Sequence, residues 1–249
     1  MPRALAYAFC GVLALVAAVA GFAPATLLDA PLALHTQQRL RLADARGFWW
    51  HGRGILASAD GSARVPIGWR VELVPLARAT LVVHLDDAVD PAAPQGTLTL
   101  SRQRIDLRDL HLRTPSALAA ALDPRLQAVA IGGTLTVDAP TFTARGDARE
   151  GSANGRWDRA RVVIGETVVD LGTVTLGASS TNHALTGTLR NAGGDLALDG
   201  TLATHAGGVE VALVLRPAAG APEPVRRILS LLGPPDATGG VRVAWRSDR

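Results

Sequence analysis

Six histidines are the residues of this chain whose type is best suited to acid–base or metal chemistry. Their spacing includes neither HExxH nor another metal-binding pattern, and the single cysteine, Cys10, provides no CxxC pair. Three of them fall in strand-like stretches, where a histidine is more often a surface residue than a ligand. We therefore predict no metal site. The six are His35, His51, His84, His111, His183 and His205.

Other patterns that could carry chemistry are equally weak. Asp86, Asp87 and Asp90 could hold a cation, but the prolines that follow them favour a polar loop. No serine lies in a GxSxG nucleophile elbow, and the stretches GGTLTV and NAGGD lack the P-loop and dinucleotide-binding spacings. We predict no catalytic, cofactor-binding or metal-binding residue, and hence a non-enzymatic protein without a cofactor. A catalytic set assembled from residues distant in sequence stays an alternative, because a sequence motif contains only residues that lie close together in the chain.

The charge pattern argues against nucleic-acid binding. All 25 basic residues are arginines, scattered among 22 acidic residues, and the net charge is +3 without a basic stripe. Hydrophobic residues make up 48% of the chain and aromatic residues only 4%, while 26 glycines and 15 prolines separate short apolar runs. This composition is typical of a protein with many turns. A lone cysteine also excludes an intramolecular disulfide.

The first element that we predict is a membrane helix. Residues 5–22 are uncharged and apolar, and as a helix these 18 residues would extend about 27 Å, close to a bilayer core of roughly 30 Å. The amino terminus and Arg3 favour a cytoplasmic start, residues 1–4. We therefore expect a signal anchor over residues 5–22 of the bacterial inner membrane, followed by a periplasmic β-rich domain, residues 23–249.

A cleaved signal peptide is the alternative interpretation of this segment. Small residues suited to cleavage occur at positions 18–20 and 23–25. The apolar stretch exceeds the roughly 7–15 residues of a usual signal-peptide core, which favours the uncleaved anchor. Both interpretations deliver the remainder of the chain to the far side of the inner membrane.

The remainder of the chain alternates like strands that pack one face on a core. Apolar residues recur at every second position over 196–202, 209–215 and 241–245. Their phase shifts at Arg108-Asp109, which predicts a bulge or a tight bend. The tag GTL recurs at unequal spacing, and its glycine would let a sheet bend sharply. The tag begins at Gly96, Gly133, Gly187 and Gly200.

Turn signals complete the predicted fold class, which is mainly β. A turn at residues 191–194 predicts a hairpin, and a third strand after it makes an antiparallel meander. We expect a curved antiparallel sheet in a meander, open-barrel or sandwich-like form, with one or two short helices. The sequence does not decide whether the sheet closes.

Two short helices interrupt the strands. Thr114 is a candidate N-cap and Pro115 a first-turn proline for the run SALAAAL, which Asp123-Pro124 ends. A second helix, residues 222–232, ends at Gly233. It places one apolar stripe on a single side. That stripe is Val225, Ile228, Leu229 and Leu232.

Aromatic and glycine landmarks follow one another in a definite order. Residues 47–52, GFWWHG, contain a GxxWxG element made by Gly47, Trp50 and Gly52. In WRVELVP, Trp69 opens a strand that ends near Pro75. The later landmarks are GGDLALDGTL, which includes Gly200, and the ending ILSLLGPPDATGGVRV, which includes Leu232, Gly233, Pro235 and Asp236.

The two most prominent tryptophans of these landmarks are interpreted as fold anchors. An indole buries a large apolar area and needs one hydrogen-bond partner for its N–H group, and glycines flank Trp50 as a sharp bend would require. Trp69 is interpreted in the same way. Trp49 should then face the other way along the strand, toward solvent, a partner or lipid.

In this order the landmarks resemble the type II secretion system protein N family over most of the chain. The resemblance implies a short cytoplasmic start, one membrane helix and a periplasmic β-rich domain without enzymatic activity. It also implies partners among the other type II secretion proteins of the inner-membrane platform. Membrane lipid would contact residues 5–22, and the landmark residues would be structural positions.

Three functional hypotheses follow. The leading one is a structural, assembly-type subunit of the apparatus that exports folded proteins from the periplasm. The alternative is a membrane-anchored periplasmic lipid-handling protein whose curved sheet carries acyl chains, suggested by Ala, Val and Leu on the inner face and by glycine-bent strands. An anchored periplasmic hydrolase is the third and weaker one. A continuous, exposed apolar groove would favour lipid handling, and a filled core with polar rims would favour the assembly role.

Overall fold

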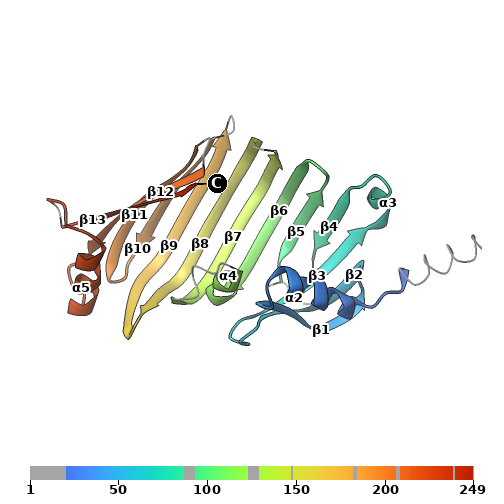
Figure 1. Cartoon of the computed structure of the whole chain (residues 1–249), viewed down its shortest axis with the longest axis horizontal. Helices are drawn as coiled ribbons and strands as arrows, with labels where there is room; N and C mark the ends of the chain where they lie inside the picture. Colours follow the sequence, from blue (N-terminus) through green and yellow to red (C-terminus); the bar gives the residue numbers. More distant parts are fainter. Residues whose placement is uncertain are drawn as a thin grey trace, which may run out of the picture.

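Thirteen β-strands form one antiparallel sheet in which each strand lies beside its neighbours in sequence (Figure 1). The computed structural model describes residues 21–86, 93–122, 129–146, 148–181, 184–205, 208–237 and 239–248. The order runs from β1 at one edge to β13 at the other, so the mainly β, antiparallel fold class is confirmed and the sheet is open. The strands are β1 (Leu40–Phe48), β2 (His51–Ser58), β3 (Arg64–Glu72), β4 (Leu81–Leu85), β5 (Gln95–Leu100), β6 (Arg104–Pro115), β7 (Ala130–Arg145), β8 (Ala148–Ile164), β9 (Thr167–Thr181), β10 (Ala184–Ala192), β11 (Leu196–His205), β12 (Gly208–Pro217) and β13 (Val241–Asp248).

The two faces of the sheet differ sharply in chemistry. Residues paired across neighbouring strands share a face, whereas successive residues of one strand point to opposite faces. One row of paired residues crosses eight strands and contains only apolar residues and glycine: Leu112, Val137, Gly155, Leu176, Leu189, Gly200, Leu213 and Val243. The adjacent row, on the other face, is Arg113, Thr136, Arg156, Thr175, Arg190, Asp199, Val214 and Arg242.

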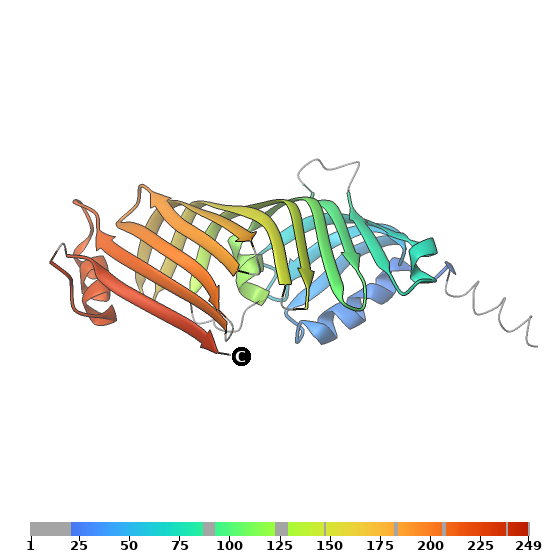
Figure 2. The ribbon, with the colours of Figure 1, turned by 90° about the horizontal axis from the view of Figure 1, so that it is seen from above.

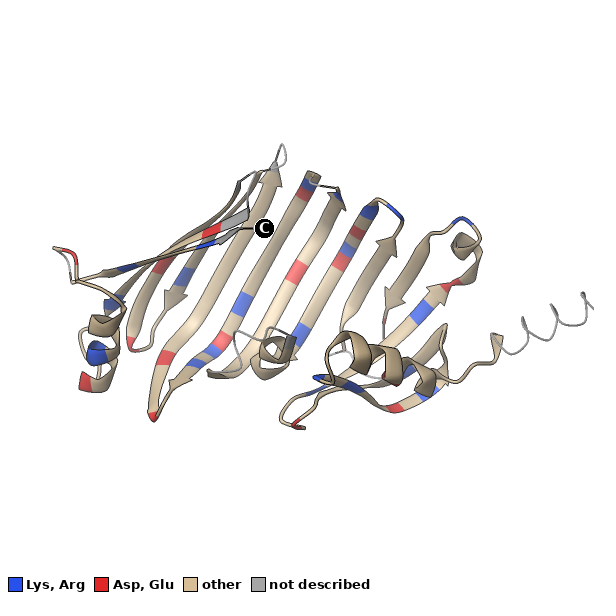
Figure 3. Cartoon of the chain, in the orientation of Figure 1, with Lys and Arg blue, Asp and Glu red and all other residues tan. Residues whose placement is uncertain are grey.

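We call the first side the apolar face and the second the polar face. Charged residues occur on strands throughout the sheet and form no continuous basic stripe over the described residues (Figure 3). The predicted alternation over residues 196–202, 209–215 and 241–245 is confirmed by β11, β12 and β13. β10, β11 and β12 form the predicted hairpin and meander.

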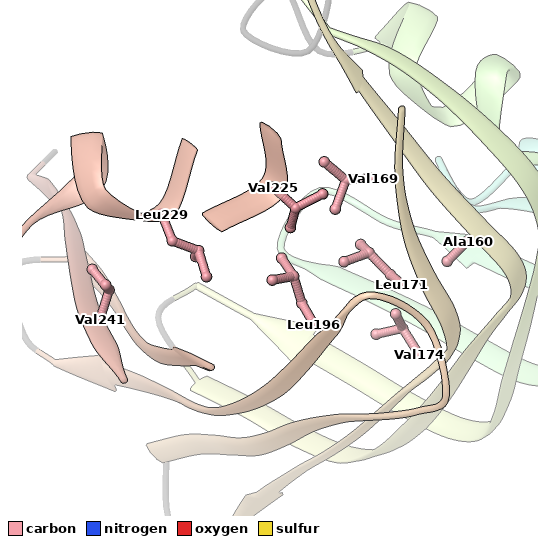
Figure 4. Close-up of a cluster of buried hydrophobic side chains, with 8 residues drawn as sticks. All are labelled: Ala160, Val169, Leu171, Val174, Leu196, Val225, Leu229 and Val241. Atoms are coloured by element: carbon pink, nitrogen blue, oxygen red, sulfur yellow. The ribbon is translucent and has the colours of Figure 1, made fainter. Parts of the chain in front are cut away.

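Short helices cover parts of the apolar face. Figure 2 shows the sheet curving, with α2, α4 and α5 on its concave side. Val225 and Leu229 of α5 are 1% and 4% exposed and pack with Val174 and Leu196 (Figure 4). The described helices are the 3-10 turn η1 (Ala25–Leu28) and the α-helices α2 (Asp29–His35), α3 (Leu73–Leu76), α4 (Ser116–Leu122) and α5 (Glu223–Leu232).

Two further clusters lie beneath the other helices. Ala25 of η1 is buried with Leu42, Trp69 and Val71, and Leu118 of α4 is buried with strand residues of β1 and β3. Each cluster removes apolar area from water, which stabilises the fold by roughly 25 cal/mol per Å² buried. The core therefore consists of three clusters on one face of the sheet, two of which share Leu32 and Ile67.

The number of helices and the start of α4 correct the prediction. The described residues contain four short α-helices rather than one or two. Thr114 is not an N-cap, because β6 continues through Thr114 and Pro115, which pair with Leu135 and Thr134. Proline lacks a backbone donor but is tolerated at a strand terminus. The helix begins only at Ser116.

Two other details of the elements also differ from the prediction. Trp69 does not open a strand, because β3 begins five positions earlier, at Arg64. Leu232 is 50% exposed, so it does not share the buried stripe of α5. That stripe consists of Val225 and Leu229, with Ile228 partly buried beside them.

A bulge in β6 confirms the predicted irregularity. Gln95 pairs with His111, whereas Thr97 pairs with Arg108, so β6 contains one extra residue here. Asp109 has φ +48° at this point. A Cβ on the opposing Gly96 would lie 2.8 Å from the Cα of Leu110, so the close approach of the bulge requires glycine.

Within the described residues, no helix has the length and apolar character needed to cross a bilayer. The predicted cytoplasmic start and residues 5–20 of the predicted anchor lie outside the described residues. The anchor therefore stays a prediction.

Candidate functional site

The GxxWxG element forms the tight turn between β1 and β2. Trp50 donates its Nε1–H to the carbonyl oxygen of Gly21 at 2.8 Å, and its ring stacks on Phe48 with centroids 5.8 Å apart and an interplanar angle of 5°. Phe22 meets Phe48 edge-on at 6.0 Å. The turn therefore holds residues 21–22, where the described chain begins, against the sheet.

Trp69 anchors the same turn from β3. It is only 6% exposed and donates its Nε1–H to the carbonyl oxygen of Trp49 at 3.0 Å. A Cβ on Gly52 would lie 2.7 Å from the Trp69 ring, and Gly47 has φ +94°. Glycine at position 52 allows the indole to lie directly on the backbone, and glycine at position 47 adopts a conformation that other residues rarely take.

Trp49 corrects the prediction that it faces away from Trp50. Both residues lie in the turn, not in a strand, so the two-residue alternation does not apply to them. Both are partly buried against the cluster that contains Trp69. The indoles of this turn thus pack within the fold.

Exposed apolar residues surround this turn. The end of β3 lies beside the turn, because the Val71 N–H donates to the carbonyl oxygen of Trp50 at 2.6 Å. Helix α3 follows directly after β3. Phe22 is 72% exposed and Val74 of α3 is 80% exposed. We call this part of the molecule the aromatic end; it consists of Phe22, Phe48, Trp49, Trp50 and α3 (Leu73–Leu76).

The second notable surface is the part of the apolar face that lies in none of the three buried clusters of the described residues. Its side chains come from central strands and are partly exposed to solvent. Ile105 and Trp245, at its margins, are 44% and 45% exposed. We call this region the uncovered apolar face; its representative residues are Leu98, Leu107, Phe142, Leu176, Leu202 and Leu213.

The remaining landmark residues are spread over several elements. Pro75 lies in α3 at the aromatic end, and Gly200 is buried in β11, where a Cβ would lie 2.4 Å from Leu213 Cδ2 and would clash with it. Gly233 follows the last residue of α5, and Pro235 is exposed. Asp236 accepts a hydrogen bond from the Gly240 N–H at 2.9 Å in the turn before β13. The structure does not bring these positions together.

Two histidines form cross-strand pairs with carboxylates on the polar face. His84 Nε2 lies 2.6 Å from Glu72 Oε1, and His84 Nδ1 lies 3.1 Å from Thr97 Oγ1. His111 Nδ1 lies 2.5 Å from Asp138 Oδ1. The carboxylate, histidine and hydroxyl of the His84 pair stand in the same order as in a hydrolase. Both pairs, however, lie on the exposed outer surface of the sheet, and the backbone amides of their strands are used in hydrogen bonds between strands.

The other candidate ligands do not assemble into a site in the described residues. His35 ends α2, and the His51 ring lies 5.9 Å from that of Trp50. No group of three or more metal-ligating side chains occurs in the part of the chain that the structure describes. Asp86 pairs with Arg70 at 3.8 Å. His183, Asp87 and Asp90, and the side chain of His205, lie outside that part.

One cavity lies beside α4 and has a volume of about 510 Å³. Its polar side contains Arg39, Ser58 and Asp60, and its apolar side contains Ala117 and Ile131. Hydrogen bonds from Ser58 and Ser62 lower the pKa of Asp60, so this carboxylate belongs to the β2–β3 turn. The cavity holds no convergent set of chemical groups.

Other carboxylates with lowered pKa are structural as well. The hydrogen bond from Arg41 and that from the Leu42 N–H lower the pKa of Asp29 at the start of α2. A hydrogen bond from Arg156 lowers the pKa of Asp158. Burial would raise the pKa of Asp106, but hydrogen bonds from Thr143 and Arg104 outweigh it.

Comparison with known proteins gives one family match. The family model described as type II secretion system (T2SS), protein N matches residues 38–244, which is most of the chain. No curated protein and no solved structure matches.

Proposed function

The chain belongs to the type II secretion system protein N family, and from that premise we propose that it is a non-enzymatic inner-membrane subunit of the secretion apparatus. The observation that carries the secretion role is the family match over residues 38–244. In this proposal the protein contributes to assembly or function of the machine that exports folded proteins from the periplasm. Its partners are other proteins of the inner-membrane platform.

The aromatic end supports a membrane-anchored arrangement. Tryptophan and other aromatic residues are favoured at the boundary between lipid and water. Phe22, 72% exposed, connects directly to the apolar stretch of residues 5–22, and Val74 extends the exposed apolar surface. In the proposed arrangement this end faces the outer surface of the inner membrane, and the sheet extends into the periplasm.

A secretion assay tests the role in export. Deletion of the gene should leave a folded substrate of the system in the periplasm and reduce its amount in the medium, and the intact gene should restore export. Undiminished export in the deletion strain would contradict the proposal. Immunoblots of other platform proteins would show whether the loss follows from failed assembly.

The non-enzymatic role has its own test in the same assay. His84→Ala removes the base of the Glu72–His84–Thr97 arrangement, and His111→Ala removes the other histidine–carboxylate pair. Both variants should restore export as well as the intact gene, because the pairs are cross-strand contacts. Loss of export in a normally abundant variant would favour the hydrolase hypothesis.

A further inference from the structure

We propose that the uncovered apolar face binds the acyl chains of a membrane lipid. This inference concerns a ligand of the sheet itself and does not depend on the secretion role. It rests on the chemistry of the face, on its continuity with the aromatic end and on the contrast with the polar face.

The floor of this face contains a row of paired residues without a hydrogen-bonding side chain. The row crosses five strands outside the three clusters, from Ala153 on β8 through Ala178, Gly187 and Leu202 to Val211 on β12, and contains only apolar residues and glycine. The backbone amides and carbonyls beneath it are engaged in the ladders between strands. A ligand that lacks polar groups over the same length, as an alkyl chain does, can cover such a surface without burying a polar group that has no hydrogen-bond partner.

The row is also long enough for such a chain. Five strands about 4.8 Å apart give a row of roughly 19 Å. An extended peptide would have to leave its own backbone groups unpaired on this floor, because the strands below already use theirs. In the described part of the chain, helices α4 and α5, whose backbone groups are paired internally, cover parts of this side of the sheet.

The face is continuous with the aromatic end. Val71 of β3 is buried beside Trp69 in that part of the molecule and pairs with Val83. Val83 pairs with Leu98, and the row continues through Leu107 to Phe142. A lipid at a membrane next to the aromatic end would therefore meet an unbroken apolar path onto the sheet.

The two faces supply a matched pair of positions for a direct test. Leu176 and Thr175 are consecutive residues of β9 that point to opposite faces, and so are Leu202 and Thr201 of β11. p-Benzoylphenylalanine is introduced in place of each residue in turn in the full-length protein. The four variants are irradiated in cells grown with ³²P-phosphate, which labels phospholipids.

We expect a labelled, lipase-sensitive adduct at positions 176 and 202 that exceeds the adduct at 175 and 201 at least tenfold. Equal labelling of both faces would overturn the proposal, because it would reflect general exposure to lipid. Absence of a lipid adduct would also overturn it, as would crosslinking of 176 and 202 to a protein instead. Folding of the four variants is checked by limited proteolysis, which does not depend on the secretion role.

Failure of this proposal is distinguishable from failure of the proposed function. Normal export in a strain without a lipid adduct would contradict the lipid ligand and leave the secretion role standing. A lipid adduct at positions 176 and 202, together with undiminished export in the deletion strain, would contradict the secretion role and keep the lipid ligand.

Discussion

Gly52 sets the packing of the aromatic end at the scale of a single residue. Its missing side chain leaves room for the Trp69 ring, and the carbonyl oxygen of Arg46 lies 2.7 Å from the position of a Cβ. The ring could not keep its hydrogen bond to Trp49 if this space were filled. One methyl group would therefore disturb three strands.

Gly52→Ala should lower the free energy of unfolding by about 2 kcal/mol, because both neighbours of the new methyl group are confined. Gly220→Ala is the matched control, since no atom lies within 4 Å of a Cβ there, and its effect should stay within ~0.5 kcal/mol. Urea unfolding of the full-length protein in mild detergent, followed by tryptophan fluorescence, measures both. Equal effects would contradict the packing argument.

Asp29 links one hydrogen-bond network to acid stability. Arg41 donates to its carboxylate at 2.6 Å and the Leu42 N–H donates at 2.8 Å, which lowers its pKa in the folded state. The folded protein therefore binds this proton less readily than the unfolded chain does. The stabilisation is present above the ordinary pKa of 3.8 and is lost as the pH falls through the lower folded-state value.

Asp29→Asn should reduce stability at pH 7 by about 1 kcal/mol and make the loss of stability below pH 4 less steep. Glu166→Gln, at an exposed position of the β8–β9 turn, controls for the change in net charge. Denaturant midpoints recorded from pH 7 to pH 3 measure the difference. An unchanged acid limb in Asp29→Asn would count against this role of the carboxylate.

At the scale of an element, α5 shows how a short helix closes one end of the core. Its ten residues are fewer than the roughly 12–15 that an isolated helix needs in water, so the helix depends on packing against the sheet for its stability. Val225 and Leu229 point into the cluster formed by β9, β11 and β13 (Figure 4). Leu231, on the opposite side, is 81% exposed.

Leu229→Ala should destabilise the protein by about 3 kcal/mol, through lost burial and the cavity left behind. Leu231→Ala makes the same chemical change in the same helix and should cost less than about 0.5 kcal/mol. Thermal unfolding of the two variants gives the comparison. Similar melting temperatures would mean that α5 does not pack as described.

At the scale of the whole molecule, one open sheet separates apolar from polar chemistry across its entire length. Helices fill only part of the apolar face, and the polar face carries the arginines and carboxylates. By the criterion of an exposed apolar surface, the architecture favours lipid contact. Membership of the secretion family and contact with lipid are compatible in one protein.

The predicted orientation has a direct test at this scale. Alkaline phosphatase fused after Asp248 should be active, because the enzyme folds only in the periplasm, whereas a cytoplasmic fluorescent reporter at the same site should be dark. Deletion of residues 5–22 should abolish the phosphatase activity. An active cytoplasmic reporter in the intact chain would refute the orientation.

Much of the fold could be predicted from local patterns. The alternation over 196–202, the bulge at Asp109 and the hairpin at 191–194 depend on residues near one another in sequence, and the structure contains all three. The start of α4 and the exposure of Leu232 could not be predicted in this way. They depend on how far β6 continues and on which side of α5 meets the sheet.

The two candidate surfaces, the aromatic end and the uncovered apolar face, were also predictable from the sequence only in part. The glycines that flank Trp50 predicted a sharp bend, and a turn lies there between β1 and β2. The direction of Trp49 was not predicted, because strand alternation was applied to a residue that lies in the turn. The uncovered apolar face has only a faint signal, the repeated Ala, Val and Leu of alternate positions. Its continuity depends on pairings between residues from five strands.

By itself, the sequence determined that this chain is a mainly β, antiparallel protein with one apolar side to its strands, because alternation and turn chemistry act over a few residues. Only the tertiary structure decided that the sheet stays open, that its helices share one face and that part of this face is left uncovered. Those features follow from strand register and curvature. Both arise from contacts between segments distant in sequence, where no local pattern specifies the partner.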